Sequence, residues 1–515
     1  MAGLGIIRRC HGDIAVIIES LFIPLTIIYF LVVAILFLYG LNFYYLAFHA
    51  WRQRRALTAE PSPVELQTLP VVTVQLPIFN EWYVAERLIR AVASLDYPRH
   101  LLEIQVLDDS TDDTFFLVKK IVHQLQMHGL NIRHLHRTDR KGYKAGALAE
   151  GLKIAQGEFI AIFDADFIPA PDFLKKVLPC FDSDRVAFVQ ARWGHLNRGY
   201  SMLTFLQSLS IDAHFAVEQL ARSRLNLWFN FNGTAGVWRK AAILDAGGWK
   251  ADTLTEDLDL SYRAFLRGWS ARYAGNIEVQ AELPVSFTAF RRQQHRWARG
   301  SFECAIRYIP IIWNSRISLP RKIQSSLHLT GYGIHLMMLA MSILYPFLLV
   351  FSRHYPALLQ LFGIAYLFNL TAFAPTVYFA VAQSALGRRW LRHLPFLLFT
   401  SILGAGMMVN TLRAAIHVWL GRTSVFERTP KYGITQRQQN WDTRRYFVKV
   451  DALVAIELGL AAFNLWTAWL GWQNSNWLIM TYALLFSFGL FFTSGLTIAQ
   501  AIRRRLFTAP KPDPA

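Results

Sequence analysis

The sequence predicts an α/β domain on a parallel sheet, inserted between membrane-spanning helices. Long apolar runs lie towards both ends of the chain, and β-branched runs alternate with helical stretches between them. The chain of 515 residues is 53% hydrophobic yet carries a net charge of +18. That combination is typical of a membrane protein with a basic cytoplasmic face. Nucleic-acid binding is the other interpretation of the charge, and the apolar runs argue against it. The three cysteines are too scattered for a disulfide framework or a zinc site.

The first apolar run extends from Ile14 to about Ala50. It is longer than a signal-peptide core, about 7–15 residues, and than a membrane span, about 20 residues. We expect one spanning helix over residues 22–48, preceded by an interfacial segment; two short spans are the alternative. The basic residues at 51–55 then predict that the following domain is cytoplasmic.

Five short runs rich in β-branched residues predict the strands of that domain. They cover residues 71–79, 103–109, 131–137, 159–166 and 186–192. The stretches at 81–95 and 114–126 have helical spacing. Alternating strands and helices predict a parallel sheet covered on both faces, whose ligand lies beyond the carboxyl ends of the strands.

Acids end two of these predicted strands: Asp108 and Asp109 end one, and Asp164 and Asp166 end another. Side chains at i and i+2 of an extended chain share a face, so Asp164 and Asp166 can contact one ligand. Carboxylate oxygens suit Mg²⁺ or Mn²⁺, which are commonly bound together with substrate phosphates. Acids at this spacing are common on surfaces. Their position after a buried strand, beside a second acid pair, favours a metal site.

The segment 253–269 begins with Thr255, Glu256 and Asp257 and continues with helical spacing. One interpretation is a capped helix whose acids interact with the helix dipole, worth about 1 kcal/mol. The other makes Asp257 a general base, which has to lie within hydrogen-bond reach of an acceptor hydroxyl.

The segment 291–300, with the sequence RRQQHRWARG, gathers arginines shortly before a long apolar run. Cations of this kind either collect at the cytoplasmic side of a span or bind a phosphate-rich substrate. We expect Arg291, Arg292 and Arg299 to be interfacial cations. Arg296 and Trp297 are the candidates for chemistry, and His295 is expected to form local hydrogen bonds.

The chain is apolar again after about residue 325. The predicted spans are 328–352, 357–386, 394–418, 449–472 and 477–500. Basic residues in the loops on both sides of 394–418 place both loops in the cytoplasm, which a single span cannot satisfy. We therefore expect 394–418 to be re-entrant or partly interfacial, an irregularity allowed where the backbone is buried in protein or lines a cavity.

Eight short motifs occur in a fixed order along the central part of the chain. They are FNE (79–81), DDSTD (108–112), KAGAL (144–148), DAD (164–166), QARW (190–193), FNGTAG (231–236), TED (255–257) and QQHRW (293–297). This order resembles the processive family 2 glycosyltransferases, above all cellulose synthases and plant cellulose-synthase-like mannan and glucan synthases. The segment 425–433 resembles the gating loop of cellulose synthase, with Phe426, Thr429 and Lys431 in matching places. Arg428 stands where that family has a small residue.

The resemblance implies a GT-A-type, Rossmann-like fold and a role for each matching residue. Donor binding falls to Asp109, Lys144, Asp164, Asp166 and Arg296, acceptor binding to Asn232, Gly233, Gln293 and Trp297, and deprotonation of the acceptor to Asp257. From the residues alone, Lys144 either reaches the nucleotide or caps its helix. A metal ion and a guanidinium can both stabilise charge that develops on a leaving diphosphate.

The implied activity is an inverting transfer of a hexose from UDP-glucose or GDP-mannose to a growing β-glycan, coupled to translocation across the lipid bilayer. Mg²⁺ or Mn²⁺ is the implied cofactor, and no nucleic acid is expected as a partner. A lipid-linked acceptor stays open, because ceramide glucosyltransferases have a similar Q-x-x-R-W motif and make glycolipids. A membrane transporter with an inactive transferase domain also stays open, although all the motif acids are present.

The predicted organisation has six parts. These are a membrane or interfacial segment (1–51), the glycosyltransferase domain (52–283), an interfacial region with the Q-x-x-R-W motif (284–325), further membrane segments (326–420), a cytoplasmic gating-like loop (421–447), and a C-terminal membrane hairpin with a basic tail (448–515). The expected location is the plasma or inner membrane, or the Golgi in a eukaryote.

Overall fold

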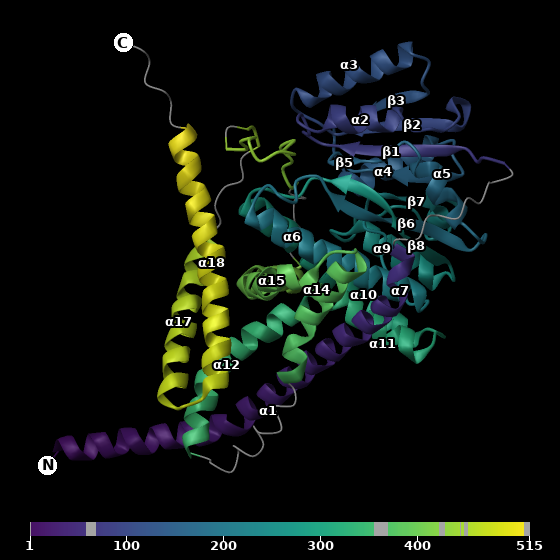
Figure 1. Cartoon of the computed structure of the whole chain (residues 1–515). Helices are drawn as coiled ribbons and strands as arrows, with labels where there is room; N and C mark the ends of the chain where they lie inside the picture. Colours follow the sequence, from purple (N-terminus) through teal and green to yellow (C-terminus); the bar gives the residue numbers. More distant parts are fainter. Residues whose placement is uncertain are drawn as a thin grey trace, which may run out of the picture.

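The structure is a computed structural model that describes residues 2–57, 68–354, 369–421, 428–442, 444–446 and 452–508. Of residues 2–19, 352–354 and 505–508 it describes the backbone alone. A long helix, α1 (Ala2–Gln53), and the short η1 (Arg54–Leu57) lead into a sheet domain, and a helical region follows that domain. Figure 1 shows the sheet domain above the diagonal of α1, with the antiparallel pair α17 (Leu453–Gln473) and α18 (Trp477–Thr508) at the opposite side.

Eight strands form one sheet in the order β3-β2-β1-β4-β7-β6-β8-β5. Their bounds are β1 Val72–Ile78, β2 Leu102–Asp108, β3 Ile132–His136, β4 Phe159–Ile162, β5 Phe167–Ile168, β6 Val186–His195, β7 Gly236–Arg239 and β8 Ser270–Ala281. All five predicted strands are present. The predicted parallel arrangement is confirmed for β3, β2, β1 and β4.

The prediction of a wholly parallel sheet is wrong in the other half. Strand β7 runs antiparallel to both β4 and β6, and β5 runs antiparallel to β8. Both β7 and β8 lie beyond residue 192, where the alternating pattern used for the prediction ends. A four-residue strand such as β7 is placed by pairing with distant strands, which its own sequence does not specify.

Helices cover both faces of the sheet, as a Rossmann-like, GT-A-type domain requires. On one face α2 (Ala85–Ala93) and α3 (Thr114–Met127) pack through a core that includes Leu88, Ile121 and Val106. On the other face α4 (Tyr143–Ile154), α9 (Glu256–Leu266) and α10 (Phe287–Asn314) share a second core. The remaining short elements of this domain are η2 Arg99–Leu101, α5 Phe173–Val177, η3 Leu178–Cys180, α6 Met202–Ala213, η4 His214–Gln219, α7 Leu220–Arg224 and α8 Lys240–Asp245.

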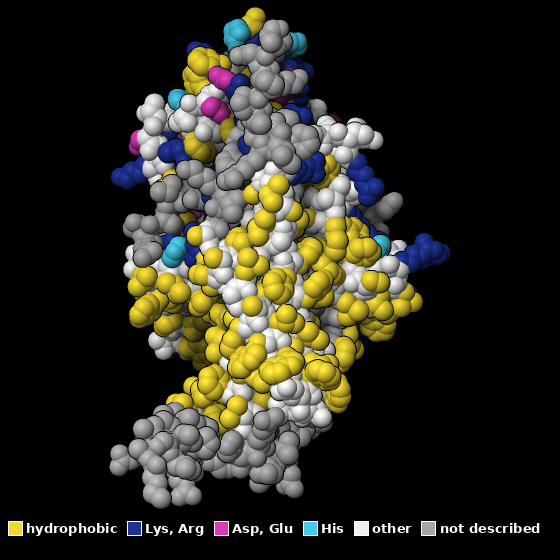
Figure 2. All heavy atoms as spheres, turned by 90° about the vertical axis from the view of Figure 1, so that its left-hand side faces the viewer, with side chains coloured by type: hydrophobic (Ala, Val, Ile, Leu, Met, Phe, Trp, Pro, Cys, Tyr) yellow, Lys and Arg dark blue, Asp and Glu magenta, His cyan; other side chains and the backbone are white. Residues whose placement is uncertain are grey.

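Within the described residues, four helices are long and apolar enough to cross a membrane. They are Ser20–Leu57, Gly333–Phe351, Leu453–Gln473 and Trp477–Arg504. Figure 2 shows a broad apolar surface over the side of the molecule formed by α17 and α18, with charged side chains gathered above it. Trp466, Trp469 and Trp472 of α17 have exposed side chains. An exposed apolar surface of this extent is typical of a lipid-facing region.

The segment 394–418 forms two helices, α15 (Leu394–Gly406) and α16 (Met408–Trp419), bent by 41° at their junction. The helix is therefore broken beside Gly406, and the re-entrant or interfacial placement of this segment stays a prediction. Addition of a Cβ to Gly406 would place that atom 2.5 Å from the carbonyl oxygen of Gly489 in α18. The chain backbones thus approach closely at this break, which only glycine permits. The other helices of this region are α11 Leu319–Leu329, α12 Gly333–His354, η5 Asn369–Phe373, α14 Ala374–Ala385 and η6 Trp390–His393.

The predicted span 357–386 falls partly outside the described residues. Its described part is η5 followed by α14, a helix of 12 residues. Helix α14 packs on α1 and α6, and its Tyr378 and Ala382 lie in a core with Leu46 and Ala50 of α1. The C-terminal spans predicted at 449–472 and 477–500 correspond to α17 and α18.

Candidate active site

A cavity of about 200 Å³ lies at the carboxyl ends of β1, β2 and β4. It is lined by all the described residues that the sequence assigned to a site: Asp109, Lys144, Asp164, Asp166, Asn232, Gly233, Asp257, Gln293, Arg296, Trp297, Thr429 and Lys431. They come from segments far apart along the chain, so the fold brings the motifs together. Phe426 lies outside the described residues.

Asp164 and Asp166 lie in the turn between β4 and β5. The expectation that they end an extended strand is wrong, because β4 stops at Ile162 and the chain turns sharply before β5. The turn nevertheless brings both carboxylates to the cavity. Asp164 Oδ1 lies 2.7 Å from Lys144 Nζ, and Asp166 Oδ2 lies 2.6 Å from Lys431 Nζ. Each acid is thus paired with one lysine.

Lys144 reaches the cavity from the first turn of α4. Its Nζ also donates to the carbonyl oxygen of Gly233 at 3.0 Å and lies 3.6 Å from Glu256 Oε1. Burial alone would lower the pKa of Lys144, but the carboxylates of Asp164 and Glu256 raise it above the usual lysine range. The Lys144 side chain therefore stays protonated at neutral pH, with acids around it.

Asp257 lies in the first turn of α9 and faces Gly233. Burial raises its pKa to about 7, Glu256 adds to the rise, and Lys144 opposes it. A carboxylate with that pKa can take up a proton near neutral pH. Gly233 has a positive φ of 79°, and a Cβ there would lie 2.9 Å from Asp257 Oδ2. Glycine at this position therefore keeps the carboxylate accessible.

The capping interpretation of this segment is wrong for Thr255 only, because Asp257 Oδ1 does accept a hydrogen bond from the backbone nitrogen of Leu258 at 2.8 Å. Thr255 does occupy the N-cap position, but its side chain makes no capping hydrogen bond. A Cβ on Gly300 of α10 would lie 2.4 Å from the Thr255 side chain, which is packed against that helix. The Thr255 hydroxyl therefore does not cap α9, because its side chain packs against α10.

The Q-x-x-R-W motif lies on α10, so Gln293, Arg296 and Trp297 share one helix. All three line the cavity. Arg296 Nη2 donates to Thr429 Oγ1 at 2.9 Å. A guanidinium at a cavity that also holds two acids in a turn can bind a diphosphate group.

Arg291 and Arg299 are not the interfacial cations that we expected. Arg291 is buried and lies 2.8 Å from Glu457 of α17, and Arg299 is buried beside Glu303 at 2.7 Å. The partner of Arg291 is 166 residues away along the chain, so no local pattern could indicate it. A buried arginine needs such a partner because an unpaired charge is costly to bury.

Asp109 and Asn232 line the cavity with their polar groups already engaged. Asp109 receives two hydrogen bonds from Arg137, at 2.8 and 2.6 Å. The side-chain oxygen of Asn232 accepts from Gln219 at 2.7 Å, and its nitrogen lies 2.8 Å from His214 Nε2. Both residues are therefore held rigidly at the wall.

The described part of the gating-like segment contributes Arg428, Thr429 and Lys431 to the wall of the cavity. Arg428 pairs with Glu81 at 2.9 Å, and Tyr446 donates to Asp112 Oδ2 at 2.5 Å. Burial raises the pKa of Glu81 to about 7, against the opposing charge of Arg428. The motif match had marked Arg428 only as a departure from the family. The fold makes it the partner of the acid in the FNE motif.

Asp108 points away from the cavity, to the sheet face covered by α3. Its carboxylate lies beside His134 and His136 of β3. The sequence contained one signal for this cluster that was overlooked: two histidines at i and i+2 of a predicted strand, which share a face.

Known proteins resemble the chain over the part that carries these motifs. Residues 70–300 match the family described as "Glycosyltransferase like family 2". Glucomannan 4-beta-mannosyltransferase 1 of Oryza sativa subsp. japonica is 35% identical over 446 residues, which cover 81% of this chain and 82% of that protein. Glucomannan 4-beta-mannosyltransferase 2 of Arabidopsis thaliana is 50% identical over 239 residues, which cover 45% of this chain and 44% of that protein.

Among solved structures, a mannosyltransferase from Pyrobaculum calidifontis in complex with GDP-Man and Mn²⁺ aligns with a TM-score of 0.49 at 21% identity. The alignment covers 76% of this chain and 100% of that one.

Proposed function

Because the chain belongs to the family 2 glycosyltransferases and is a cellulose-synthase-like hexosyltransferase, we propose a specific donor and acceptor for it. We propose that it transfers mannose from GDP-mannose to a growing β-glycan. The observation that carries the proposal is the cavity, which gathers Asp257, Arg296 and the Asp164–Asp166 turn. The choice of mannose over glucose is supported by the glucomannan mannosyltransferase of rice, 35% identical over 82% of its length.

In this mechanism Asp257 accepts the proton of the acceptor hydroxyl. Its carboxylate faces the cavity beside Gly233, and its pKa of about 7 suits a base that works near neutral pH. Trp297 and Gln293, on the adjoining helix, hold the acceptor sugar. Removal of the proton makes the acceptor oxygen nucleophilic, and attack from the face opposite the leaving group inverts the anomeric carbon.

The leaving diphosphate is held by cations of this chain. Arg296, Lys144 and Lys431 line the cavity, and the two lysines are within ion-pair distance of the acids in the turn. When phosphate oxygens arrive, each lysine can exchange its carboxylate partner for phosphate. We assign Asp109, which pairs with Arg137, to the nucleoside of the donor.

Asp164 and Asp166 fit a divalent metal, because two carboxylates on one cavity wall offer the hard oxygen ligands that Mg²⁺ and Mn²⁺ prefer. A bound ion would supply positive charge to the leaving diphosphate. EDTA should abolish transfer and added Mg²⁺ or Mn²⁺ should restore it; full activity in the chelator would remove the metal from the mechanism.

We further propose that the catalytic domain is cytoplasmic and that the helices around it span the membrane several times. Sugar nucleotides are made in the cytoplasm, and Arg52, Arg54 and Arg55 lie at the C-terminal end of the first apolar helix. In a background without native cysteines, a thiol placed at Asp182, an exposed residue of the sheet domain, should resist an impermeant reagent added to intact cells. Labelling there would invert the topology.

The donor and the product decide between the candidate activities. Detergent-solubilised chain should be incubated with radiolabelled GDP-mannose or UDP-glucose, and the product separated by organic extraction. We expect label from GDP-mannose in an insoluble polymer that a β-mannanase releases. Label from UDP-glucose alone would overturn the donor assignment, and label extracted into the organic phase would favour a glycolipid product.

A further inference from the structure

We propose that Asp108, His134 and His136 form a second metal site, separate from the cavity and suited to Zn²⁺. The three residues come from the adjacent strands β2 and β3, where Val106 is paired with His134 and Asp108 with His136. Because residues at i and i+2 of a strand share a face, both imidazoles lie on the face that carries Asp108. One ligand atom from each side chain lies within 4.8 Å of the other two.

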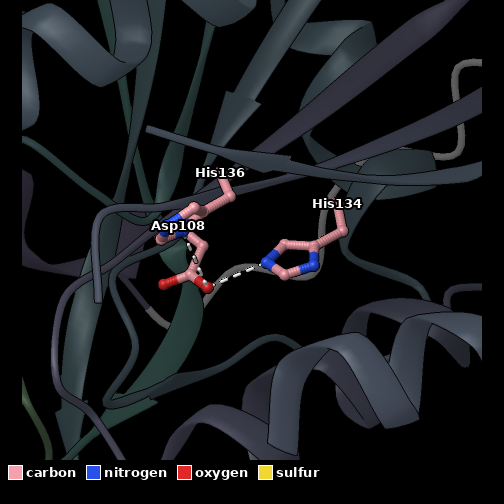
Figure 3. Close-up of side chains that lie close together, drawn as sticks. All are labelled: Asp108, His134 and His136. Atoms are coloured by element: carbon pink, nitrogen blue, oxygen red, sulfur yellow. Dashed lines mark hydrogen bonds and ion pairs between the residues drawn. The ribbon is translucent and has the colours of Figure 1, made fainter. Parts of the chain in front are cut away.

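The ligand atoms converge. Figure 3 shows both histidine rings with a nitrogen directed at the Asp108 carboxylate. His134 Nε2 lies 2.8 Å and His136 Nδ1 lies 3.7 Å from the same oxygen, Asp108 Oδ2. Ligands of a tetrahedral zinc ion, with bonds of about 2.0–2.1 Å, lie about 3.3 Å apart. The two separations bracket that value, so small side-chain rotations can place an ion between the three atoms.

The ligand types select the metal. Two imidazoles and one carboxylate suit Zn²⁺ and related first-row ions, whereas Mg²⁺ and Ca²⁺ prefer oxygen ligands. The acids of the cavity, Asp164 and Asp166, offer oxygen alone. The two sites therefore have different metal preferences.

The surroundings provide support for the ligands and access for an ion. The backbone nitrogen of Ser110 donates to Asp108 Oδ1 at 2.9 Å, which leaves Oδ2 for the ion. The ring of Phe115 lies 4.6 Å from that of His136 and 5.4 Å from that of His134, measured between centroids. The His136 side chain is 29% exposed, so an ion and a coordinating water can enter from solvent.

The competing explanation is a hydrogen bond between His134 and Asp108 with no ion. The test uses the full-length chain in detergent micelles, with Asp164→Asn and Asp166→Asn to remove the oxygen ligands of the cavity. After equilibration with Zn²⁺ and dialysis, elemental analysis should find about one Zn²⁺ per chain. His136→Ala and His134→Gln should each reduce this content at least tenfold, whereas His123→Ala, an exposed histidine of α3, should not.

His134→Gln keeps a side-chain donor for Asp108, so the hydrogen-bond explanation predicts a folded chain whose zinc content equals that of the parent. Zinc content that is equal in the parent, His136→Ala and His134→Gln chains would overturn the site, as would a parent chain with no retained zinc. A second measurement avoids the cavity substitutions. Co²⁺ added to the otherwise natural chain should give a visible absorption band typical of imidazole ligation, and His136→Ala should remove it; no band in the natural chain would also overturn the site.

Discussion

The cavity and the helix bundle beside it both bury charge, and they compensate it differently. In the cavity, Asp164 pairs with Lys144 while 34% of its side chain remains exposed. In the bundle, Arg291 pairs with Glu457 at exposures of 3% and 0%. Ser494 also donates to Glu457, at 2.9 Å, and Thr497 lies 3.3 Å from the guanidinium.

The two regions differ in whether the buried cation can exchange its anionic partner for a ligand. A lysine ammonium beside open space can exchange one anionic partner for another when a ligand arrives. A guanidinium enclosed by a carboxylate and hydroxyls has no room for a ligand, so its pair ties α10 to α17 and α18. The same arginine-rich segment thus supplies a cavity-lining group that we propose binds the donor, Arg296, and a structural one, Arg291. Four predictions test this distinction.

The largest effect is expected for Asp257→Asn, which removes the proton acceptor and nearly preserves shape. Sugar transfer should fall about 10²–10⁴-fold, while binding of the nucleotide, measured by calorimetry, should remain. The control is Asp184→Asn, an exposed acid outside the cavity. Normal transfer by Asp257→Asn would show that this carboxylate only stabilises the start of α9 and is not the general base.

The next effect is on stability. Glu457→Leu leaves the Arg291 guanidinium buried without its carboxylate, and should cost about 3–5 kcal/mol in the free energy of unfolding. Replacing both partners, Arg291→Met with Glu457→Leu, should recover most of that loss. Leu465→Ala, a half-exposed residue of the same helix, is the control. Unfolding in mixed micelles measures all four; a Glu457→Leu chain as stable as the parent would show that the pair is not structural.

The third effect is on pH dependence. Asp257 must be ionised to accept a proton, and its pKa is about 7. Transfer should therefore fall about tenfold per pH unit below that value and level off above it. Burial raises the pKa of Glu81 to about 7 as well, so Glu81→Gln is the decisive control. If the acidic limb disappears in Glu81→Gln, the limb belongs to that residue and the assignment to Asp257 is wrong.

The smallest effect is expected for Lys431→Met. Lys431 occupies Asp166 Oδ2 at 2.6 Å and so competes with a divalent ion for that oxygen. A hydrogen bond with a net worth of about 1 kcal/mol corresponds to about fivefold in an equilibrium constant. The Mg²⁺ concentration for half-maximal activity should fall by about that factor, and Lys153→Met, which removes an exposed pair on α4, should leave it unchanged. A rise in that concentration would mean that Lys431 assists the metal.

Many of the residues that line the cavity were predictable because they belong to short motifs of neighbouring residues. The acids after β2 and β4, the TED sequence and the Q-x-x-R-W motif are recognisable in the sequence alone. The geometry of the turn that carries Asp164 and Asp166 was not predictable. Whether Asp164 and Asp166 end a strand or form a turn depends on where β4 stops, and β4 stops where its pairing with β7 ends.

By itself, the sequence determined the α/β class, the strands of the parallel half and the apolar helices, because periodicity and composition act over neighbouring residues. Tertiary structure alone decided the mixed half of the sheet, the burial of Arg291, the position of Arg428 and the convergence of two histidines on Asp108. Each of these depends on a partner that is distant along the chain, such as Glu457 for Arg291 or Glu81 for Arg428. A buried charge requires some partner, but which one is available is a property of the folded chain.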